Sequence, residues 1–227
     1  MNVLPWVVYP YLAAAVFLGG HLWRWRHDRL GWTSRSSQLL EQRWLRIGSP
    51  LFHVGLLGVI GGHVVGILVP ARVTRAAGVS DHAYHVLALG AGGLFGALAL
   101  AGIVILTLRR LLVGRVRRAG ARVDLAVDLL LLAVIGLGMG ETLGWNLLAG
   151  EYAYRETVSV WFRQLPALSP DASLMSGAPW IYQAHVLASL TLFALWPFSR
   201  LVHVWTAPVQ YAVRRAWVLY RAAARTA

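Results

Sequence analysis

Five stretches of the chain have the length and apolarity of helices that cross a membrane. A membrane-spanning helix needs about 20 apolar residues, and 58% of the 227 residues are hydrophobic, more than in most soluble domains. The expected spans are residues 5–23, 50–69, 83–108, 125–148 and 179–205. We therefore predict an all-α fold: one integral membrane domain, residues 1–227, built as a polytopic bundle of five transmembrane helices.

The arginines indicate how this bundle is oriented. They are abundant after spans one, three and five, and sparse in the other two connections, which hold only Arg72, Arg75, Arg155 and Arg163. Because basic loops stay on the cytoplasmic side, we expect the N-terminus outside and the tail, residues 206–227, in the cytoplasm. The expected location is the cytoplasmic (inner) membrane, with the tail against lipid or against soluble partner subunits. Nucleic-acid binding is not expected, since the basic clusters flank membrane-length apolar runs.

The chain contains no cysteine. Disulfides, cysteine-ligated iron–sulfur clusters and c-type haem, which needs a Cys-x-x-Cys-His signature, are therefore excluded. Any redox cofactor of this chain must be held by other side chains.

Four histidines lie inside the apolar stretches, His53 and His63 in span two and His185 and His203 in span five. Ionisable side chains at membrane depth are costly and mark functional sites, and neutral imidazole is a common ligand of haem iron. Spans two and five run in opposite directions, so His63 should lie near His185 and His53 near His203. This pattern favours two haems with two histidine ligands each. Zinc is less favoured, because no cysteine or carboxylate lies near these histidines in the sequence.

The spacing of the histidines differs between the two spans. His185 and His203 are 18 residues apart, about 27 Å along a straight helix, whereas His53 and His63 are separated by 10 residues, about 15 Å. Two stacked haems therefore require a bend, and Pro197 is its expected source. Span two also carries glycines that suit either close helix packing or the approach of a flat porphyrin. They are Gly55, Gly58, Gly61, Gly62 and Gly66.

Two runs of residues resemble a known family. The first is RIGSPLFHVG, residues 46–55, followed by the second histidine ten positions after the first, and the other is PFSRLVHVW, residues 197–205. They resemble the gamma subunit of the membrane-bound respiratory nitrate reductase, a five-span di-haem cytochrome b. The resemblance covers most of the chain and weakens in the outer loops and the tail.

The resemblance implies a complete set of roles. His53 with His203 would ligate the inner haem b iron, and His63 with His185 the outer one. The chain would oxidise menaquinol or ubiquinol near the outer face and pass electrons through both haems to an iron–sulfur (beta) subunit. A molybdenum catalytic (alpha) subunit would then reduce nitrate, which this chain itself would not bind.

A quinol site needs polar groups near the outer haem. The start of span three supplies His82, Tyr84 and His85, of which His85 is our first choice; capping of the helix at the interface is the alternative. Some family members use a lysine in this region, and this chain has none, which leaves that role to one of these three.

Three further features of the sequence have two interpretations each. Arg200 either holds haem propionates or anchors the inner end. Arg109 and Arg110 are the alternative partners of the propionates, although anchoring is the favoured interpretation for these two. Glu141, deep in span four, serves either a proton path or a hydrogen bond to a neighbouring helix. Residues 149–178 include an amphipathic stretch around Trp161 that either lies in the membrane interface or packs on the bundle.

Two other functions remain open. The chain could be the di-haem subunit of another quinone-linked complex, such as one that reduces sulfur compounds. It could also be a haem-free anchor or transporter whose histidines serve packing or proton relay.

Overall fold

The computed structural model describes residues 3–28, 31–33, 37–150 and 152–206. Within these residues the chain is helical and contains no strand, which confirms the all-α prediction. Five helical segments are long and apolar enough to cross a membrane, which confirms the number of predicted spans. They are Leu4–His27, Arg43–Leu68, Asp81–Leu112, Arg122–Asn146 and Trp180–Phe198. The predicted tail lies outside the described residues, apart from its first residue.

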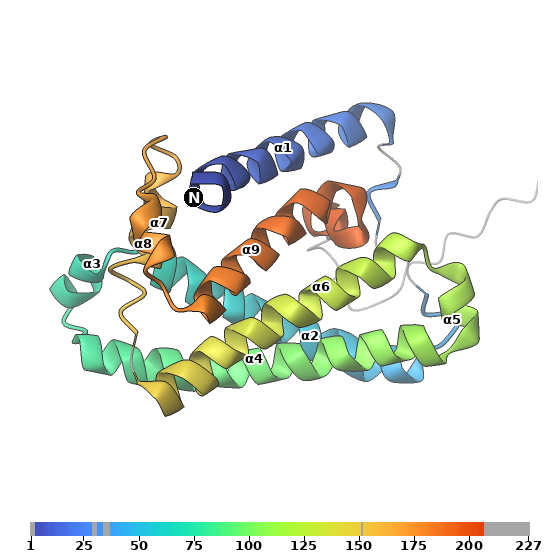
Figure 1. Ribbon diagram of the computed structural model, residues 1–227. Helices are drawn as coiled ribbons and strands as arrows, with labels where there is room; N and C mark the ends of the chain where they lie inside the picture. The colour runs from blue at the N-terminus through green and yellow to red at the C-terminus, as the bar shows by residue number, and fades with distance from the viewer. Residues whose placement is uncertain (1–2, 29–30, 34–36, 151, 207–227) are drawn as a thin grey trace, which may run out of the picture.

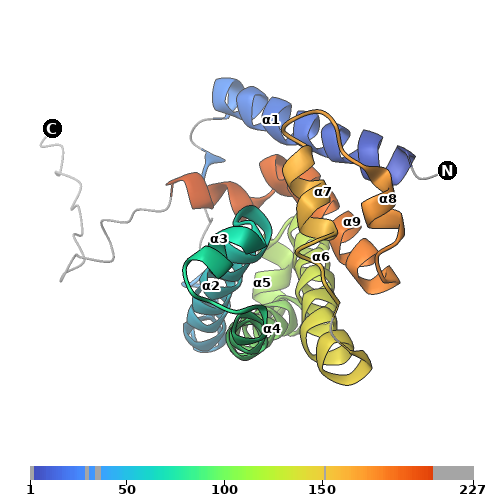
Figure 2. The ribbon, with the colours of Figure 1, turned by 90° about the vertical axis from the view of Figure 1, so that its left-hand side faces the viewer.

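The long helices pack in series. α2 lies against α4, α4 against α6, α6 against α9, and α9 against α1 (Figure 1), and Figure 2 shows the same arrangement from one end of the bundle. The described elements, in chain order, are η1 (Leu4–Val8), α1 (Tyr9–His27), α2 (Arg43–His63), η3 (Val64–Leu68), α3 (Ala71–Ala76), α4 (Asp81–Leu112), α5 (Gly114–Ala119), α6 (Arg122–Met139), η4 (Gly140–Ala149), α7 (Val158–Gln164), α8 (Ala172–Ser176), α9 (Trp180–Leu195), η5 (Trp196–Phe198) and η6 (Arg200–Thr206).

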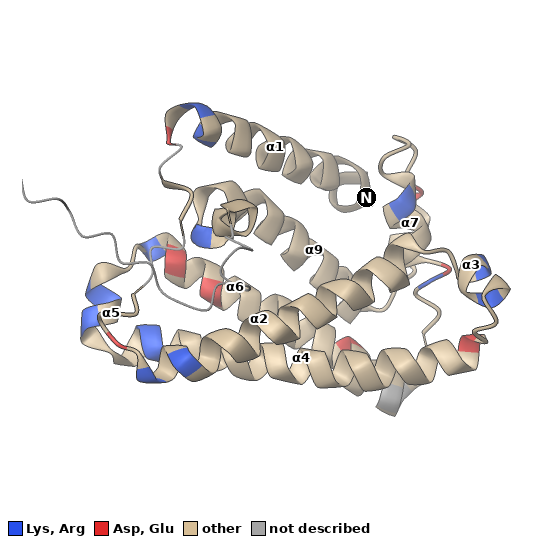
Figure 3. Cartoon of the chain, turned by 180° about the vertical axis from the view of Figure 1, so that it is seen from behind, with Lys and Arg blue, Asp and Glu red and all other residues tan. Residues whose placement is uncertain are grey.

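The two ends of the bundle differ in charge. At one end, around α5 and the first turn of α6, arginines gather, and we call this the α5 end (Figure 3). The opposite end carries α3, α7 and α8 and is called the α7 end. α4 connects them: Ser80 caps its N-terminus by accepting a hydrogen bond from the Ala83 amide (3.2 Å), and Arg109 and Arg110 occupy its last turn. The Ser80 cap satisfies a free amide at the N-terminus of α4. The positive charges of Arg109 and Arg110 at its C-terminus complement the helix dipole.

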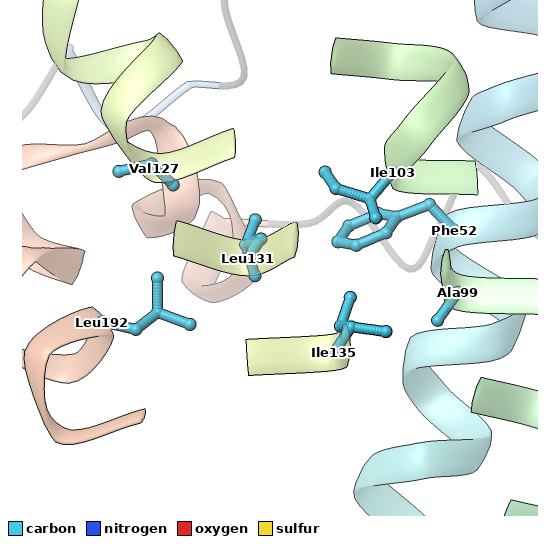
Figure 4. Packing of buried hydrophobic residues seen from close by; sticks show 7 residues of the cluster. All are labelled: Phe52, Ala99, Ile103, Val127, Leu131, Ile135 and Leu192. Atoms are coloured by element: carbon cyan, nitrogen blue, oxygen red, sulfur yellow. The ribbon is translucent and has the colours of Figure 1, made fainter. Parts of the chain in front are cut away.

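A small apolar core joins α2, α4, α6 and α9. Its buried members are Phe52, Ala99, Ile103, Val127, Leu131, Ile135 and Leu192 (Figure 4). In the most apolar 18-residue stretch of each span, only 11–22% is buried inside the protein. Most residues of these spans are therefore not buried within the protein, as expected where lipid rather than water surrounds a bundle.

The fifth predicted span, residues 179–205, is wrong as a single helix. α9 ends at Leu195, a 3₁₀ turn carries Pro197, and Ser199 is extended with φ −116° and ψ −179°. The chain then continues as the separate 3₁₀ helix η6. Proline lacks an amide hydrogen and its ring clashes with the preceding turn, so the expected bend at Pro197 is instead a full break of the helix.

The α7 segment packs on the bundle. Trp161 is 1% exposed, and its indole Nε1 donates to the Trp6 carbonyl (2.9 Å). Side chains of this segment also bind backbone carbonyls at the end of span two: Ser159 binds that of Gly66 (3.1 Å) and Arg163 that of Ile67 (2.5 Å). These donors satisfy carbonyls that have no partner inside the helix. Of the two interpretations of the amphipathic stretch, packing on the bundle is the one the structure favours.

Glycines allow α2 and α4 to approach closely. A Cβ added at Gly55 would meet the Ala99 amide and the Phe95 carbonyl, and one added at Gly102 would meet the backbone of Phe52. Nothing lies within 4 Å of the same position at Gly61. Close packing thus accounts for Gly55, as it commonly does for small residues between membrane helices.

We expect Gly55→Ala to destabilise the bundle by about 1–3 kcal/mol, because the atoms in its way belong to the backbone and cannot turn aside. Gly61→Ala serves as the matched control and should be neutral or stabilising by up to about 1 kcal/mol, since alanine favours helix more than glycine. Thermal unfolding of both variants in detergent measures the difference. Equal melting temperatures would contradict the close contact.

Candidate functional site

The structure brings the four membrane histidines together in two pairs. The ring centroids of His63 and His185 are 6.0 Å apart with an interplanar angle of 21°, and those of His53 and His203 are 6.1 Å apart with an angle of 70°. These are the pairs expected from two antiparallel segments. Each pair joins elements that lie more than 100 residues apart in the chain, and neither pair includes a carboxylate.

All four rings are fixed through the same nitrogen. Nδ1 lies 2.7 Å from the Ser49 carbonyl in His53, 2.8 Å from that of Val59 in His63, 3.0 Å from that of Val134 in His185 and 2.5 Å from that of Arg200 in His203. A carbonyl oxygen only accepts, so Nδ1 carries the hydrogen, and in the neutral ring Nε2 then has a lone pair. Metal-binding histidines commonly use this arrangement, in which the second nitrogen orients the ring.

Two other histidines show that the hydrogen bond at Nδ1 is not sufficient evidence of a ligand. His21 and His27 bind the carbonyls of Phe17 (2.7 Å) and Trp23 (2.8 Å) in the same way. However, His21 Nε2 already accepts a hydrogen bond from the Trp205 indole (3.0 Å), and His27 stacks on Trp23. The four paired histidines are distinguished because each faces a second imidazole.

The distance within each pair suits a two-ligand metal site. Imidazole–metal bonds are about 2 Å long, so an ion bound to one nitrogen of each ring would keep the centroids at roughly the observed distance. In the part of the chain that the structure describes, no group of three or more His, Cys, Asp or Glu side chains converges on a common point. This donor set fits haem, whose macrocycle supplies the other ligands, better than zinc, which takes four.

The break after α9 resolves the mismatch in histidine spacing. His185 lies on α9 and His203 on η6, so the 18 residues between them do not form one straight helix. Because the chain changes direction at Pro197, His203 on η6 lies beside His53. The tertiary structure thus allows two pairs even though the histidines are spaced so differently along the chain.

Residues of α6 lie beside the His185 ring. A Cβ at Gly138 would lie 3.1 Å from its Cε1 atom, and the ring binds the Val134 carbonyl of the same helix, α6. Gly66, three residues after His63, lies beside the hydroxyls of Tyr84 and Tyr154, which would be 2.9 and 2.7 Å from an added Cβ. The polar groups predicted for quinol therefore lie at the same end of the bundle as the His63–His185 pair.

Of the three residues predicted at the start of span three, Tyr84 has the clearest contacts. Its hydroxyl lies 2.8 Å from that of Tyr154, and the Arg155 guanidinium carbon lies 3.9 Å from the centre of its ring. Burial, and secondly the hydrogen bond with Tyr84, raise the pKa of Tyr154, so this phenol stays neutral and can donate. His82 is exposed and His85 half-buried.

Sequence reasoning missed Tyr154 and Arg155. They lie in the connection between spans four and five, and only the fold brings them to Tyr84. Arg155, buried, also donates to the Thr74 hydroxyl (3.1 Å) and the Val69 carbonyl (3.2 Å). The sequence signal that could have pointed to this cluster is an arginine in a connection with few arginines, directly after a tyrosine.

Arg200 has a carboxylate partner. Its Nε and Nη2 atoms lie 2.9 and 2.7 Å from the two oxygens of Asp124, and Arg110 approaches the same carboxylate at 3.4 Å and that of Asp128 at 2.5 Å. A role of Arg200 toward haem propionates stays a prediction.

Arg109 is likewise held by the protein. It donates to Glu41 Oε2 (2.6 Å) and to the Ser37 hydroxyl (2.9 Å). Although burial alone would raise the pKa of Glu41, hydrogen bonds from the Trp44 amide and Arg109 outweigh that effect and lower it. Arg109 therefore ties α4 to the segment before α2.

The fold and the histidine pairs define a class: an all-helical membrane protein of five spans with two imidazole pairs between its helices. The family model for the nitrate reductase gamma subunit matches residues 2–223. The chain is 45% identical over 216 residues to the nitrate reductase gamma chain of Bacillus subtilis, covering 95% of this chain and 96% of that one. It is 33% identical to the respiratory nitrate reductase 1 gamma chain of Escherichia coli, with 95% of both chains covered. The chain belongs to the family of respiratory nitrate reductase gamma subunits.

A further relative is longer. The nitrate reductase-like protein NarX of Mycobacterium tuberculosis is 48% identical over 222 residues, which are 97% of this chain but 34% of that protein. The chain thus spans about a third of the length of this relative.

Proposed function

We propose that this chain is the membrane-anchoring, di-haem cytochrome b subunit of a respiratory nitrate reductase. It oxidises quinol near the α7 end and delivers the electrons to iron–sulfur and molybdenum subunits at the α5 end, where nitrate is reduced. The observation that carries the proposal is the pair of facing imidazoles at each of two levels, with all four Nδ1 atoms bound to backbone carbonyls. The two full-length gamma-chain relatives support the nitrate reductase complex as its setting.

The residues present fit two haems. His63 and His185 would hold the haem nearer the α7 end, and His53 and His203 the other. Haem with two histidine ligands supplies one-electron transfer without an open coordination position. The protein's part is to fix the orientation of each ring through the Nδ1 hydrogen bond, which leaves Nε2 free to bind the metal.

The charge distribution supports the predicted orientation. Arginines gather at the α5 end (Figure 3), which we place in the cytoplasm, facing the partner subunits. Electrons taken at the α7 end then cross the membrane inward while protons leave outside. Each charge moved across the membrane is worth about 2.3 kcal/mol per 100 mV, so quinol oxidation by this chain would energise the cytoplasmic membrane.

Visible spectroscopy of the purified complex tests the proposal. Bis-histidine haem b gives sharp reduced bands, and a haem determination should give two haems per gamma chain. Reduction of the bands by a quinol analogue, followed by their reoxidation on addition of nitrate, would support the whole assignment. A preparation without haem would point to an anchor or transporter, and reoxidation by a sulfur compound but not by nitrate would point to a different complex.

The quinol site is proposed near Tyr84 and His85. His85 precedes Gly92 and Gly96 by 7 and 11 residues, close to two and three helical turns, so it shares their face of α4. This face packs on α6 and η4, since Gly92 lies beside Thr142 and Gly96 beside Met139. His85 thus faces the interior of the α7 end, where a quinol could reach both it and the His63–His185 pair.

We expect His85→Asn to slow quinol oxidation about 10- to 100-fold while leaving the haem content at two, because it removes a proton acceptor but no ligand. His82→Asn is the matched control: His82 is exposed, and its replacement should change neither quantity. Stopped-flow reduction of the haems by a quinol analogue measures the rate. Unaltered kinetics in His85→Asn would remove this residue from the site.

A further inference from the structure

Glu141 lies in the first turn of η4, within span four and toward the α7 end. Its Oε1 atom is buried and has no hydrogen-bond partner among the described residues. No described residue forms an ion pair with its carboxyl group either. Burying an ionised carboxylate without a partner is very costly, so the side chain is held as a neutral carboxylic acid.

A hydrogen-bonded polar cluster surrounds this acid. The Asn146 side-chain amide donates both to the backbone carbonyl of Glu141 (2.8 Å) and to the Tyr182 hydroxyl (2.8 Å). Its oxygen accepts from the Tyr152 amide (3.0 Å), and the rings of Tyr152 and Tyr182 are 4.8 Å apart. We call Glu141, Asn146, Tyr152 and Tyr182 the Glu141 cluster.

The segments that pack on η4 bring titratable side chains close to Glu141. α9 contributes Tyr182, the connection after η4 contributes Tyr152, and the facing side of α4 contributes His85. The acids of α6, Asp124 and Asp128, precede Glu141 by at least 13 residues, about 20 Å along the helix. Arg155, in the same connection as Tyr152, binds the Thr74 hydroxyl and the Val69 carbonyl instead. Among the described residues no arginine forms an ion pair with Glu141.

The backbone around Glu141 is unusual as well. Gly140–Ala149 forms a π-helix of ten residues, a conformation that is rare and often marks a functional site. The Asn146 side chain binds the Glu141 carbonyl across this wider turn. The rare π-helix and the buried carboxyl group of Glu141 thus occur at the same place. This place is close to the turn of α6 in which Gly138 lies beside His185.

We propose that Glu141 relays a proton from quinol toward the α7 end. Oε1 accepts the proton of a quinol hydroxyl while the other carboxyl oxygen releases its own proton toward water at that end. One O–H bond of the quinol breaks and one forms at Oε1, a second carboxyl O–H bond breaks, and the acid ends neutral as it began. The electrons leave through the chain as in the proposed function, on which this inference rests.

The test compares Glu141→Gln with Glu156→Gln in the intact complex. Glutamine keeps the shape of the side chain but cannot release a proton, so quinol oxidation should fall about 100-fold, with two haems and unchanged spectra. Glu156 is exposed in the connection after η4, and its replacement should leave the rate unchanged. Glu141→Asp should restore part of the rate, which a merely structural role would not predict.

Infrared spectroscopy gives a readout independent of turnover. The wild-type protein should show the carbonyl stretch of a protonated carboxylic acid that Glu141→Gln lacks and Glu156→Gln retains. Absence of this band in the wild-type protein, or an unchanged quinol rate in a folded Glu141→Gln complex, would overturn the relay. A wild-type complex that oxidises no quinol would instead overturn the proposed function.

Discussion

We expect His185→Ala to reduce the haem content from two to one per chain and to bring quinol oxidation down to background. The variant removes one of the two imidazoles that face each other at 6.0 Å. It also removes the hydrogen bond between Nδ1 and the Val134 carbonyl, which orients the ring. A haem left with a single protein ligand is not retained as a bis-histidine centre, so electrons from quinol lose their first acceptor.

His63→Ala should give the same result, because the pair acts as one site. His27→Ala is the matched control: its ring makes the same kind of Nδ1 hydrogen bond, to Trp23, but faces no second histidine. This control should retain both haems and full quinol oxidation. Haem determination, reduced-minus-oxidised spectra and quinol kinetics measure the three variants. Retention of two haems in His185→Ala would show that the pairing is wrong.

Asp124→Ala is expected to cost about 1–3 kcal/mol in the free energy of unfolding, because it leaves the half-buried Arg200 guanidinium without its carboxylate partner. The Asp124 side chain is 4% exposed, and its carboxylate binds Arg200 at 2.7 Å, Arg110 at 3.4 Å and the Ala121 amide at 3.0 Å. One carboxylate therefore holds together α4, the start of α6 and η6. Loss of this contact also frees the segment that carries His203.

Asp28→Ala provides the control for this prediction. Asp28 is also an acid that pairs with an arginine, Arg24, but the separation is 3.5 Å and its side chain is 46% exposed. Such surface pairs contribute about 0–1 kcal/mol. Thermal unfolding in detergent should separate the two variants clearly, and haem release from the His53–His203 site should accompany unfolding of Asp124→Ala at the lower temperature. Similar melting temperatures would mean that the Asp124 network carries little stability.

The glycines of span two illustrate where sequence and structure differ. Their spacing is compatible with a surface for porphyrin and with close helix packing, and the two histidines beside them favoured the porphyrin surface. The structure places Gly55 against the α4 backbone, Gly58 against the Phe95 ring and Gly66 beside two tyrosine hydroxyls. A Cβ added at Gly61 or Gly62 would instead meet no atom within 4 Å. The positions share one residue type but have different neighbours, which only the packed helices decide.

Local patterns in the sequence were enough to determine the number of spans, the approximate position of each and the four histidines, although the fifth helix ends earlier than predicted. Hydropathy and helix length depend on the segment itself and on the surrounding lipid. The tertiary structure alone decided the contact between Tyr84 and Tyr154 and the pairing of Arg200 with Asp124, and it showed that the bend expected at Pro197 is a full break of the helix. These contacts join residues distant in the chain, and they follow from how side chains fit when helices pack, which no local pattern encodes.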